Sequence, residues 1–398
     1  MAAARLANLE DLASQSAWDS LEQYLGVALR KRLGEAAQHL RREADALQTA
    51  LAEARTPEQL ERVRRRVVAF RSHYLRTETA LDFYADAVGT RTSPGTAALL
   101  RACDALAYRS MAQVLDPLGL PTPLVLTYID RGLGASILKA GLRLWDQRTE
   151  SPAAAIKIVR HNLLRPTALI HESGHQVAHL CGWNDELAGA LEAGLAPPAI
   201  AAVWAGWASE IAADAFAFAH TGYAAVASLH DVLAGDEAFV FQYLPDDPHP
   251  MNYVRVLLGV EMCRRFFGRG PWDELAASWA HGHPLHRAAP GVQALVHASL
   301  PLLPAVVELS LCTPMQAFGG RPLAALVNPE RVRPEALARL EAELGPALYS
   351  SMHWVWTEAL RLLALTGFQA ATAPEASEDA LKRQESWMLR LGTSLRAA

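Results

Sequence analysis

Two histidines four residues apart, His171 and His175, enclose the sequence His-Glu-Ser-Gly-His. If the segment is helical, both rings lie on one face of the helix, close enough to bind the same metal ion. Glu172 lies beside them, where its carboxylate can accept a proton from a metal-bound water. The residue types and their spacing therefore predict a hydrolytic zinc site. A solvated helix face is the alternative interpretation of these five residues taken alone.

The flanking residues favour a buried helix around the two histidines. Pro166 suits the first turn of a helix, where a missing N–H removes no bond, and Gly182 suits its C-terminal end. Most residues between them are apolar or small. An apolar helix normally excludes imidazoles that lack a partner, so a bound metal accounts for their presence. We expect His179, further along the same stripe, to pack in the core or behind the ligands.

Two histidines leave a catalytic zinc ion one protein ligand short. The metzincin pattern would place glycine and histidine where this chain has Ala178 and Cys181, so that pattern is excluded. A glutamate from a later helix remains, and residues 207–216 have helical character with Glu210 and Asp214 on one face. We predict that Glu210 is the third ligand and that Asp214 accepts a hydrogen bond from a ligand histidine, which fixes its tautomer. The alternative is a helix that turns one polar stripe toward water.

Three elements, in order along the chain, resemble a known family. HExxH is followed by Glu-x-x-Ala-Asp-Ala-Phe-Ala at residues 210–217, and then by His-Pro-x-x-x-x-Arg at residues 249–255. This set resembles the gluzincin peptidases of the CAAX prenyl protease and heat-shock membrane protease group, over roughly residues 120–260. The resemblance implies a zincin-like catalytic core that binds one zinc ion.

The resemblance also implies that His249, Tyr253 and Arg255 contribute catalytic groups. These side chains would stabilise the oxyanion that forms during hydrolysis, or would hold Glu210 or the substrate carbonyl in place. The family spacing does not fix the position of Tyr253. In the alternative interpretation, His249 and Pro250 form only a loop turn, and Arg255 forms a salt bridge on a helix.

The chain departs from that group in ways that limit the substrate. It lacks the membrane helices, the export signal and the Asn-Ala-Phe-Ala-x-Pro-Gly-Gly hairpin of the group. The longest apolar run, residues 196–208, is too short to cross a bilayer, and two prolines and a glutamate interrupt residues 300–311. We therefore expect no transmembrane segment, a cytoplasmic location, and a peptide or protein substrate. The resemblance does not support a prenylated or membrane-embedded substrate. Export without a signal peptide and the oligomeric state stay open.

Short β-rich runs precede the HExxH helix. Leu124–Ile129, residues 137–144 and residues 155–159 are predicted strands of a small sheet. Zincin peptidases hold substrate against such a sheet, because an edge strand can pair with an extended peptide through main-chain hydrogen bonds. Residues 155–159, nearest the motif in sequence, are the predicted edge strand. An ordinary hairpin packed against the helices is the alternative.

Most of the remaining sequence has helical periodicity, beginning with residues 15–75. Residues 92–95 and 116–121 are predicted breakpoints that separate an N-terminal helical region from the catalytic core. A flexible connection is expected at residues 369–379. The predicted fold is mainly α with a small β-sheet (α+β). Its expected parts are an N-terminal helical region (1–115), a zincin-like catalytic core (116–268) and a C-terminal helical region (269–398).

Length and composition agree with this organisation. The chain has 398 residues, enough to bury a large core, and a net charge of −5, which argues against a nucleic-acid partner. The arginine-rich block at residues 62–66 lies beside glutamates and is expected to be a solvated helix face. The four cysteines form no Cys-x-x-Cys pair, so we expect buried thiols in a reducing compartment.

The sequence thus favours a zinc-dependent endopeptidase with Glu172 as general base. The main alternative is a metal-binding regulatory or scaffold protein that keeps a zincin-like site without protease activity. A purely structural site has no use for Glu172, which favours the enzyme. Peptide deformylase also uses HExxH, but its third ligand is a cysteine in a Glu-Gly-Cys motif. The only upstream cysteine here, Cys103, lies in Arg-Ala-Cys-Asp, which excludes that chemistry.

Overall fold

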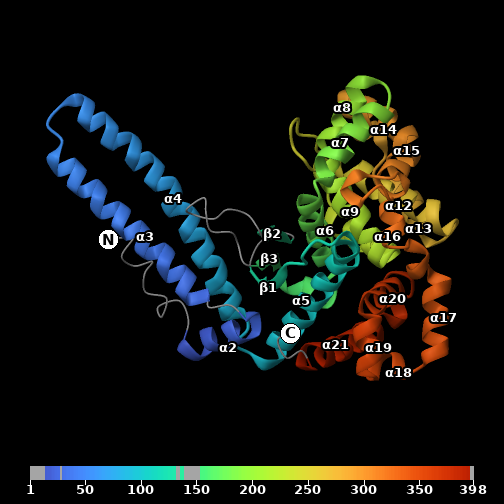
Figure 1. Cartoon of the computed structure of the whole chain (residues 1–398). Helices are drawn as coiled ribbons and strands as arrows, with labels where there is room; N and C mark the ends of the chain where they lie inside the picture. The colour runs from blue at the N-terminus through green and yellow to red at the C-terminus, as the bar shows by residue number, and fades with distance from the viewer. Residues whose placement is uncertain (1–13, 27–28, 131–134, 139–152, 395–398) are drawn as a thin grey trace.

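The computed structural model describes residues 14–26, 29–130, 135–138 and 153–394 (Figure 1). They form a mainly helical protein with one small three-stranded sheet, which confirms the predicted fold class. A long helical hairpin projects on one side of the sheet, and a body of many helices lies on the other (Figure 1). The candidate site residues all belong to the helical body.

The hairpin consists of α3 (Leu29–Glu53) and α4 (Pro57–Thr90), and the shorter α2 (Gln15–Leu25) lies near its base. A capping box starts α4, because the Thr56 hydroxyl accepts the Gln59 N–H while the Gln59 side chain accepts the Thr56 N–H. Buried apolar side chains at the base of the hairpin pack against residues of β1 and β3. The three helices confirm the helical periodicity of this part of the sequence.

Three strands cross the sheet in the order β1 (Leu124–Ile129), β3 (Ala153–Ile158) and β2 (Ser136–Leu138). β1 is parallel to β3, and β2 is antiparallel to it. The prediction that residues 155–159 form an edge strand is therefore wrong. Nearly every residue of β3 is buried, as in a central strand that is covered on both faces.

The HExxH helix, α6 (Thr167–Cys181), packs against β2 and β3. Of the strand predicted at residues 137–144, the first two residues belong to β2, and the others lie outside the described residues. Among the described strands, β2 is therefore the edge strand that lies beside the HExxH helix.

The backbones of α6 and α9 (Ala208–Thr221) cross in close contact. A Cβ atom added at Gly174 would lie 2.9 Å from the Cα of Ala213 and 3.0 Å from the Cβ of Phe216. A real Cβ cannot approach the backbone of another helix so closely, so the crossing requires glycine at this position. This contact sets the distance between the two helices that carry the predicted metal ligands.

Further helices complete the body around this pair (Figure 1). The predicted breakpoints at residues 92–95 and 116–121 lie at the two ends of α5, whose residues share one core with the helices that follow. In chain order these helices are α5 (Pro94–Leu115), α7 (Trp183–Gly194), α8 (Pro198–Gly206), α10 (Tyr223–Leu233), α11 (Glu237–Val240), α12 (Asn252–Phe267), α13 (Pro271–Gly282), α14 (Pro290–Ser299), α15 (Leu303–Val307), α16 (Leu323–Leu326), α17 (Pro334–Leu344), α18 (Ala347–Ser350), α19 (Met352–Thr357), α20 (Ala359–Thr372) and α21 (Ser377–Ser394).

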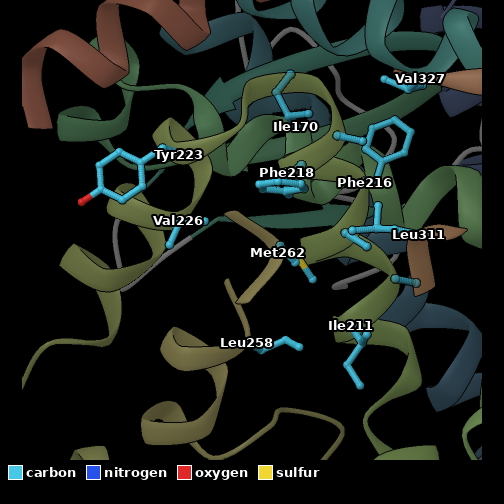
Figure 2. Packing of buried hydrophobic residues seen from close by; sticks show 14 of the residues in the cluster. Ile170, Ile211, Phe216, Phe218, Tyr223, Val226, Leu258, Met262, Leu311 and Val327 are labelled. Atoms are coloured by element: carbon cyan, nitrogen blue, oxygen red, sulfur yellow. The ribbon is translucent and has the colours of Figure 1, made fainter. Parts of the chain in front are cut away.

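One hydrophobic core joins these helices, from α5 through α6, α9 and α12 to α21. Figure 2 shows part of it, where Ile211, Phe216 and Phe218 of α9 share the core with Met262 of α12. The core includes residues from all three predicted regions of the chain. The predicted boundaries at residues 115 and 268 are therefore not boundaries between separate cores, and the division into regions stays a prediction.

The predicted flexible connection at residues 369–379 is wrong. α20 continues to its end at Thr372, a 3-10 turn occupies Pro374–Ala376, and α21 follows at once. Gln369 donates a hydrogen bond to Glu341 and accepts one from Arg383, so its side chain links three helices. These tertiary contacts order a segment whose composition alone suggested a loop.

The stretch Pro290–Cys312 is continuously helical and is long and apolar enough to cross a membrane. It includes α14 and α15, and its last turn is π-helical. Val296, Val306 and Leu311 are buried in the core, where the stretch packs against α12 and α9. A buried core helix meets the same criteria, so the expected absence of a transmembrane segment stays a prediction.

Substituting Gly174 tests the crossing of α6 and α9. Gly174→Ala should lower the free energy of unfolding by about 1–3 kcal/mol, because the added methyl group must push two packed backbones apart. Gly189→Ala on α7 is the matched control, since a Cβ there meets nothing within 4 Å. The control should be neutral or stabilising by up to about 1 kcal/mol. Urea unfolding of both variants measures the difference, and equal effects would contradict the proposed crossing.

Candidate metal centre

α6 carries both histidines of the motif on one face. The helix begins directly after Pro166, which occupies the N-cap position and not the first turn, and it ends at Gly182 with a φ of 70°. Glycine is the residue that most readily adopts this left-handed conformation. The ring centroids of His171 and His175 are 4.8 Å apart, with the ring planes at 88°. The predicted helix and the pairing of its histidines are therefore present.

α9 brings Glu210 to the two rings. Glu210 Oε2 lies 3.4 Å from Nε2 of His171, and Glu210 Oε1 lies 3.2 Å from Nε2 of His175. The ligand atoms of the three residues lie within 4.8 Å of one another. Zinc bonds of about 2.1 Å in tetrahedral geometry separate neighbouring ligand atoms by about 3.4 Å. The donor set and its spacing thus fit one zinc-sized ion, and we call these three residues the ligand cluster.

Each histidine has a partner that leaves Nε2 directed at the cluster. Asp214 Oδ1 lies 2.8 Å from Nδ1 of His171, as predicted. Ser209 Oγ lies 3.3 Å from Nδ1 of His175 and can accept its N–H. Such partners fix the tautomer and the orientation of a metal-binding ring. The sequence analysis missed Ser209, although its place directly before Glu210 in an apolar helix was a usable signal.

Arg255 lies behind the cluster and is not exposed to a substrate. Its side chain is only 6% exposed and donates to Glu210 Oε2 at 2.8 Å, to Asp214 Oδ2 at 2.6 Å and to Asp214 Oδ1 at 2.9 Å. The resemblance allowed either an oxyanion donor or a group that holds Glu210. The geometry is that of the second, because the buried Arg255 side chain binds the carboxylates of Glu210 and Asp214.

The buried charges around the cluster favour a divalent cation. Glu172, Glu210 and Asp214 carry three negative charges, and Arg255 returns one positive charge, when both histidines are neutral. An uncompensated pair of negative charges is costly in a buried setting. Without metal, a proton on His171 offsets one of these two charges. A divalent ion bound to neutral histidines would balance both, which favours a metal independently of the motif.

Burial and hydrogen-bond partners shift the pKa values of Glu172, Glu210 and His171. Burial raises the pKa of Glu172, which is 7% exposed, above its ordinary value. Burial would also raise the pKa of Glu210, but hydrogen bonds with His171 and His175 outweigh it and lower that pKa. For His171, burial alone would lower the pKa, yet Asp214 and Glu210 raise it to about 10. Without metal, the cluster therefore holds a proton on His171.

His249 faces the cluster from the solvent side. Its side chain is 61% exposed, and its Nε2 lies 3.6 Å from Glu210 Oε1. This placement agrees with the predicted donor to an oxyanion. Asp247, another residue that the sequence analysis missed, contacts the opposite ring nitrogen of His249 at 2.6 Å.

Tyr253 lies among aromatic side chains. Its ring centroid is 5.1 Å from that of Phe241 and 6.4 Å from that of Trp279, and its carbonyl accepts the Trp279 indole N–H. Within the described part of the chain, its hydroxyl forms no hydrogen bond with a ligand residue. Packing at the start of α12 accounts for its position, and its catalytic role stays a prediction.

The end of α6 differs from expectation. His179 is exposed and does not pack in the core. Cys181 is half-buried, and burial raises its thiol pKa to about 11. All four cysteines are free, and only Cys103 and Cys263 are buried as predicted. None of them joins the ligand cluster.

A cavity of about 340 Å³ lies between α10, α20 and α21. Its wall includes Tyr223, Asp231 and Gln384, and none of the predicted site residues lines it. The cavity is therefore separate from the metal centre, although Thr167 at the start of α6 contributes to its wall.

No protein-family model, curated protein or solved structure matches this chain. The resemblance to gluzincin peptidases therefore rests on three short motifs and on the geometry that joins them. In that geometry, side chains of α6, α9, α12 and the segment before α12 meet although they are far apart in sequence.

Zinc affinity should depend steeply on pH. The His171 pKa of about 10 means that this ring carries two protons at neutral pH without metal, and zinc must displace the one on Nε2. The apparent affinity should therefore rise by about tenfold per pH unit between pH 6 and 8. Asp214→Asn should make this dependence less steep at the alkaline end of the range, because the variant loses one of the two carboxylates that raise the pKa of His171. Chelator competition across the pH range measures both slopes, and a flat wild-type profile would contradict the assignment.

Ser209 should contribute to zinc affinity through His175. Ser209→Ala removes the acceptor for the ring Nδ1–H, which should weaken zinc binding by about 10- to 100-fold with little change in fold. Ser228→Ala, on α10, is a control that does not contact the cluster. Chelator competition at fixed pH measures the effect. Equal affinities in the two variants would mean that Ser209 has no role in ring orientation.

Proposed function

We propose that this protein is a zinc-dependent endopeptidase. The observation that carries the proposal is the convergence of His171, His175 and Glu210 at zinc-ligand distances, with the buried carboxylate of Glu172 on the same helix. Three protein ligands leave one position for water, which is the pattern of catalytic zinc sites. Structural zinc sites are closed by a fourth protein ligand, and the described residues offer none within the cluster.

The chain supplies the groups that such hydrolysis needs. Zinc bound at the cluster would lower the pKa of its water toward neutrality and polarise the scissile carbonyl. Glu172, whose pKa burial raises, would accept the proton of that water and pass it to the leaving amine. His249 would act in its doubly protonated form, donating Nδ1–H to Asp247 and Nε2–H to the oxyanion. Asp214, Ser209 and Arg255 would hold the ligands in place.

We propose that an extended peptide pairs with β2 during cleavage. β2 is an edge strand among the described residues, and it packs against the HExxH helix. Main-chain hydrogen bonds to an edge strand bind a peptide with little dependence on its side chains. This arrangement suits cleavage within a chain, and it replaces the earlier prediction that placed the substrate on residues 155–159.

A metal-binding scaffold without protease activity is the second candidate. The observation in its favour is the hairpin of α3 and α4, which projects from the body (Figure 1). It exposes several apolar side chains, namely Leu51, Leu60, Val67, Val68 and Leu75. Exposed apolar residues on a projecting element are suited to a protein partner. Such a protein would need the ligand cluster but not the buried carboxylate of Glu172.

Glu172→Gln separates the two candidates. The amide cannot accept the proton of the water, so peptide hydrolysis should fall by at least about 100-fold while one zinc per chain is retained. His175→Ala should lose both zinc and activity. Elemental analysis and cleavage of a mixed peptide library by the same preparations measure the two properties. Full activity of Glu172→Gln would move the general base elsewhere, and zinc-loaded wild-type protein that cleaves no peptide would favour the scaffold.

A further inference from the structure

A single carboxylate oxygen contacts both the backbone and the ring of His249. Asp247 Oδ1 accepts the backbone N–H of His249 at 2.9 Å and lies 2.6 Å from its ring Nδ1. Nothing in the three motifs includes Asp247. The contact leaves Nε2, the other ring nitrogen, facing Glu210 Oε1 at 3.6 Å.

The ring of His249 needs such a restraint because little else holds it. The residue lies between α11 and α12, outside any helix or strand, and its side chain is 61% exposed. An exposed side chain on a loop samples several rotamers, and fixing one of them has an entropic cost. Two contacts to one oxygen tie the ring to its own backbone, which restricts rotation about both side-chain bonds.

A tight turn presents Asp247 to His249. The Asp247 N–H donates to the Leu244 carbonyl at 3.2 Å, which closes a four-residue turn. Pro245 is its second residue, and Asp246 is its third, with a φ of 66°. Proline followed by a residue with positive φ is the signature of a type II turn. Asp246 is the sole non-glycine residue with positive φ in the described ranges, so the backbone is unusual where Asp247 is positioned.

We propose that Asp247 is a positioning residue that holds His249 with Nε2 directed at the metal centre. The inference rests on the proposed function, because it assigns Asp247 to the same peptide hydrolysis through His249. Asp247 forms its side-chain hydrogen bonds with His249 and none with the ligand cluster among the described residues, so we expect its effect on turnover to pass through the imidazole. The competing explanation is an exposed Asp–His pair that only stabilises a loop.

A double-mutant cycle tests the coupling. Asp247→Ala should lower kcat by about tenfold or more with KM and zinc content unchanged, since a misplaced donor fails mainly in the transition state. Asp247→Asn should keep most of the activity, because its amide oxygen can accept both N–H groups. Asp247→Ala should have no further effect in a His249→Ala background. Effects that multiply in the double variant would overturn the proposal.

Asp231→Ala is the matched control. Asp231 also pairs with a histidine on the surface of α10, since its Oδ1 lies 3.4 Å from Nδ1 of His230, and its Oδ2 lies 3.1 Å from Nη1 of Arg165. None of these three residues belongs to the ligand cluster. The control should leave kcat unchanged. An equal loss of kcat in the control and in Asp247→Ala would favour a general loss of stability and overturn the proposal.

Crystal structures of the zinc-loaded wild type and of Asp247→Ala give a readout that does not need activity. We expect the His249 ring to turn away from Glu210 or to lose its defined position in the variant, with the cluster unchanged. A ring that keeps its place in the variant overturns the inference. If the wild type cleaves no peptide, the proposed function fails, and the ring position still decides whether Asp247 orients His249.

Discussion

The distance between α6 and α9 where Gly174 faces Ala213 controls the geometry of the metal centre. Both ligand histidines lie on one helix and Glu210 on the other, so their separations follow from this one backbone contact. Metal–ligand distances tolerate only about 0.2 Å of variation. A crossing that shifted by the width of a methyl group would leave Glu210 out of reach of an ion bound to the histidines.

This crossing buries charge, and α12 supplies the compensation. Two carboxylates of α9 would be costly so deep in the core without Arg255, which donates to both of them. The same stretch of chain carries His249 on the solvent side of Glu210. Residues 249–255 therefore contact Glu210 through two side chains, Arg255 in the core and His249 on the solvent side. The packing of this one segment sets both the position of a metal ligand and the position of the histidine that would face a substrate.

The sequence determined the local features of the site. Spacing of four residues on a helix brings His171 and His175 to one face, and it does the same for Glu210 and Asp214, wherever the helices lie. Gly182 ends the HExxH helix by adopting a left-handed conformation. This end was predictable because it depends only on the local backbone. The overall helical content was also predictable, because the spacing of apolar residues along each segment is a local property that indicates a helix.

Only the tertiary structure decided which faces meet and at what depth. Strand order depends on pairing between distant segments, so the buried β3 was mistaken for an edge, and contacts among three helices ordered a segment predicted to be flexible. The same holds for Arg255, whose position behind Glu210 follows from the docking of α12. Ser209 and Asp247 orient their histidines through contacts that depend on how the chain folds around each ring. Spacing along a helix determines the direction in which each ligand side chain points. Long-range packing determines the distances between ligands on different helices, and a metal centre needs both.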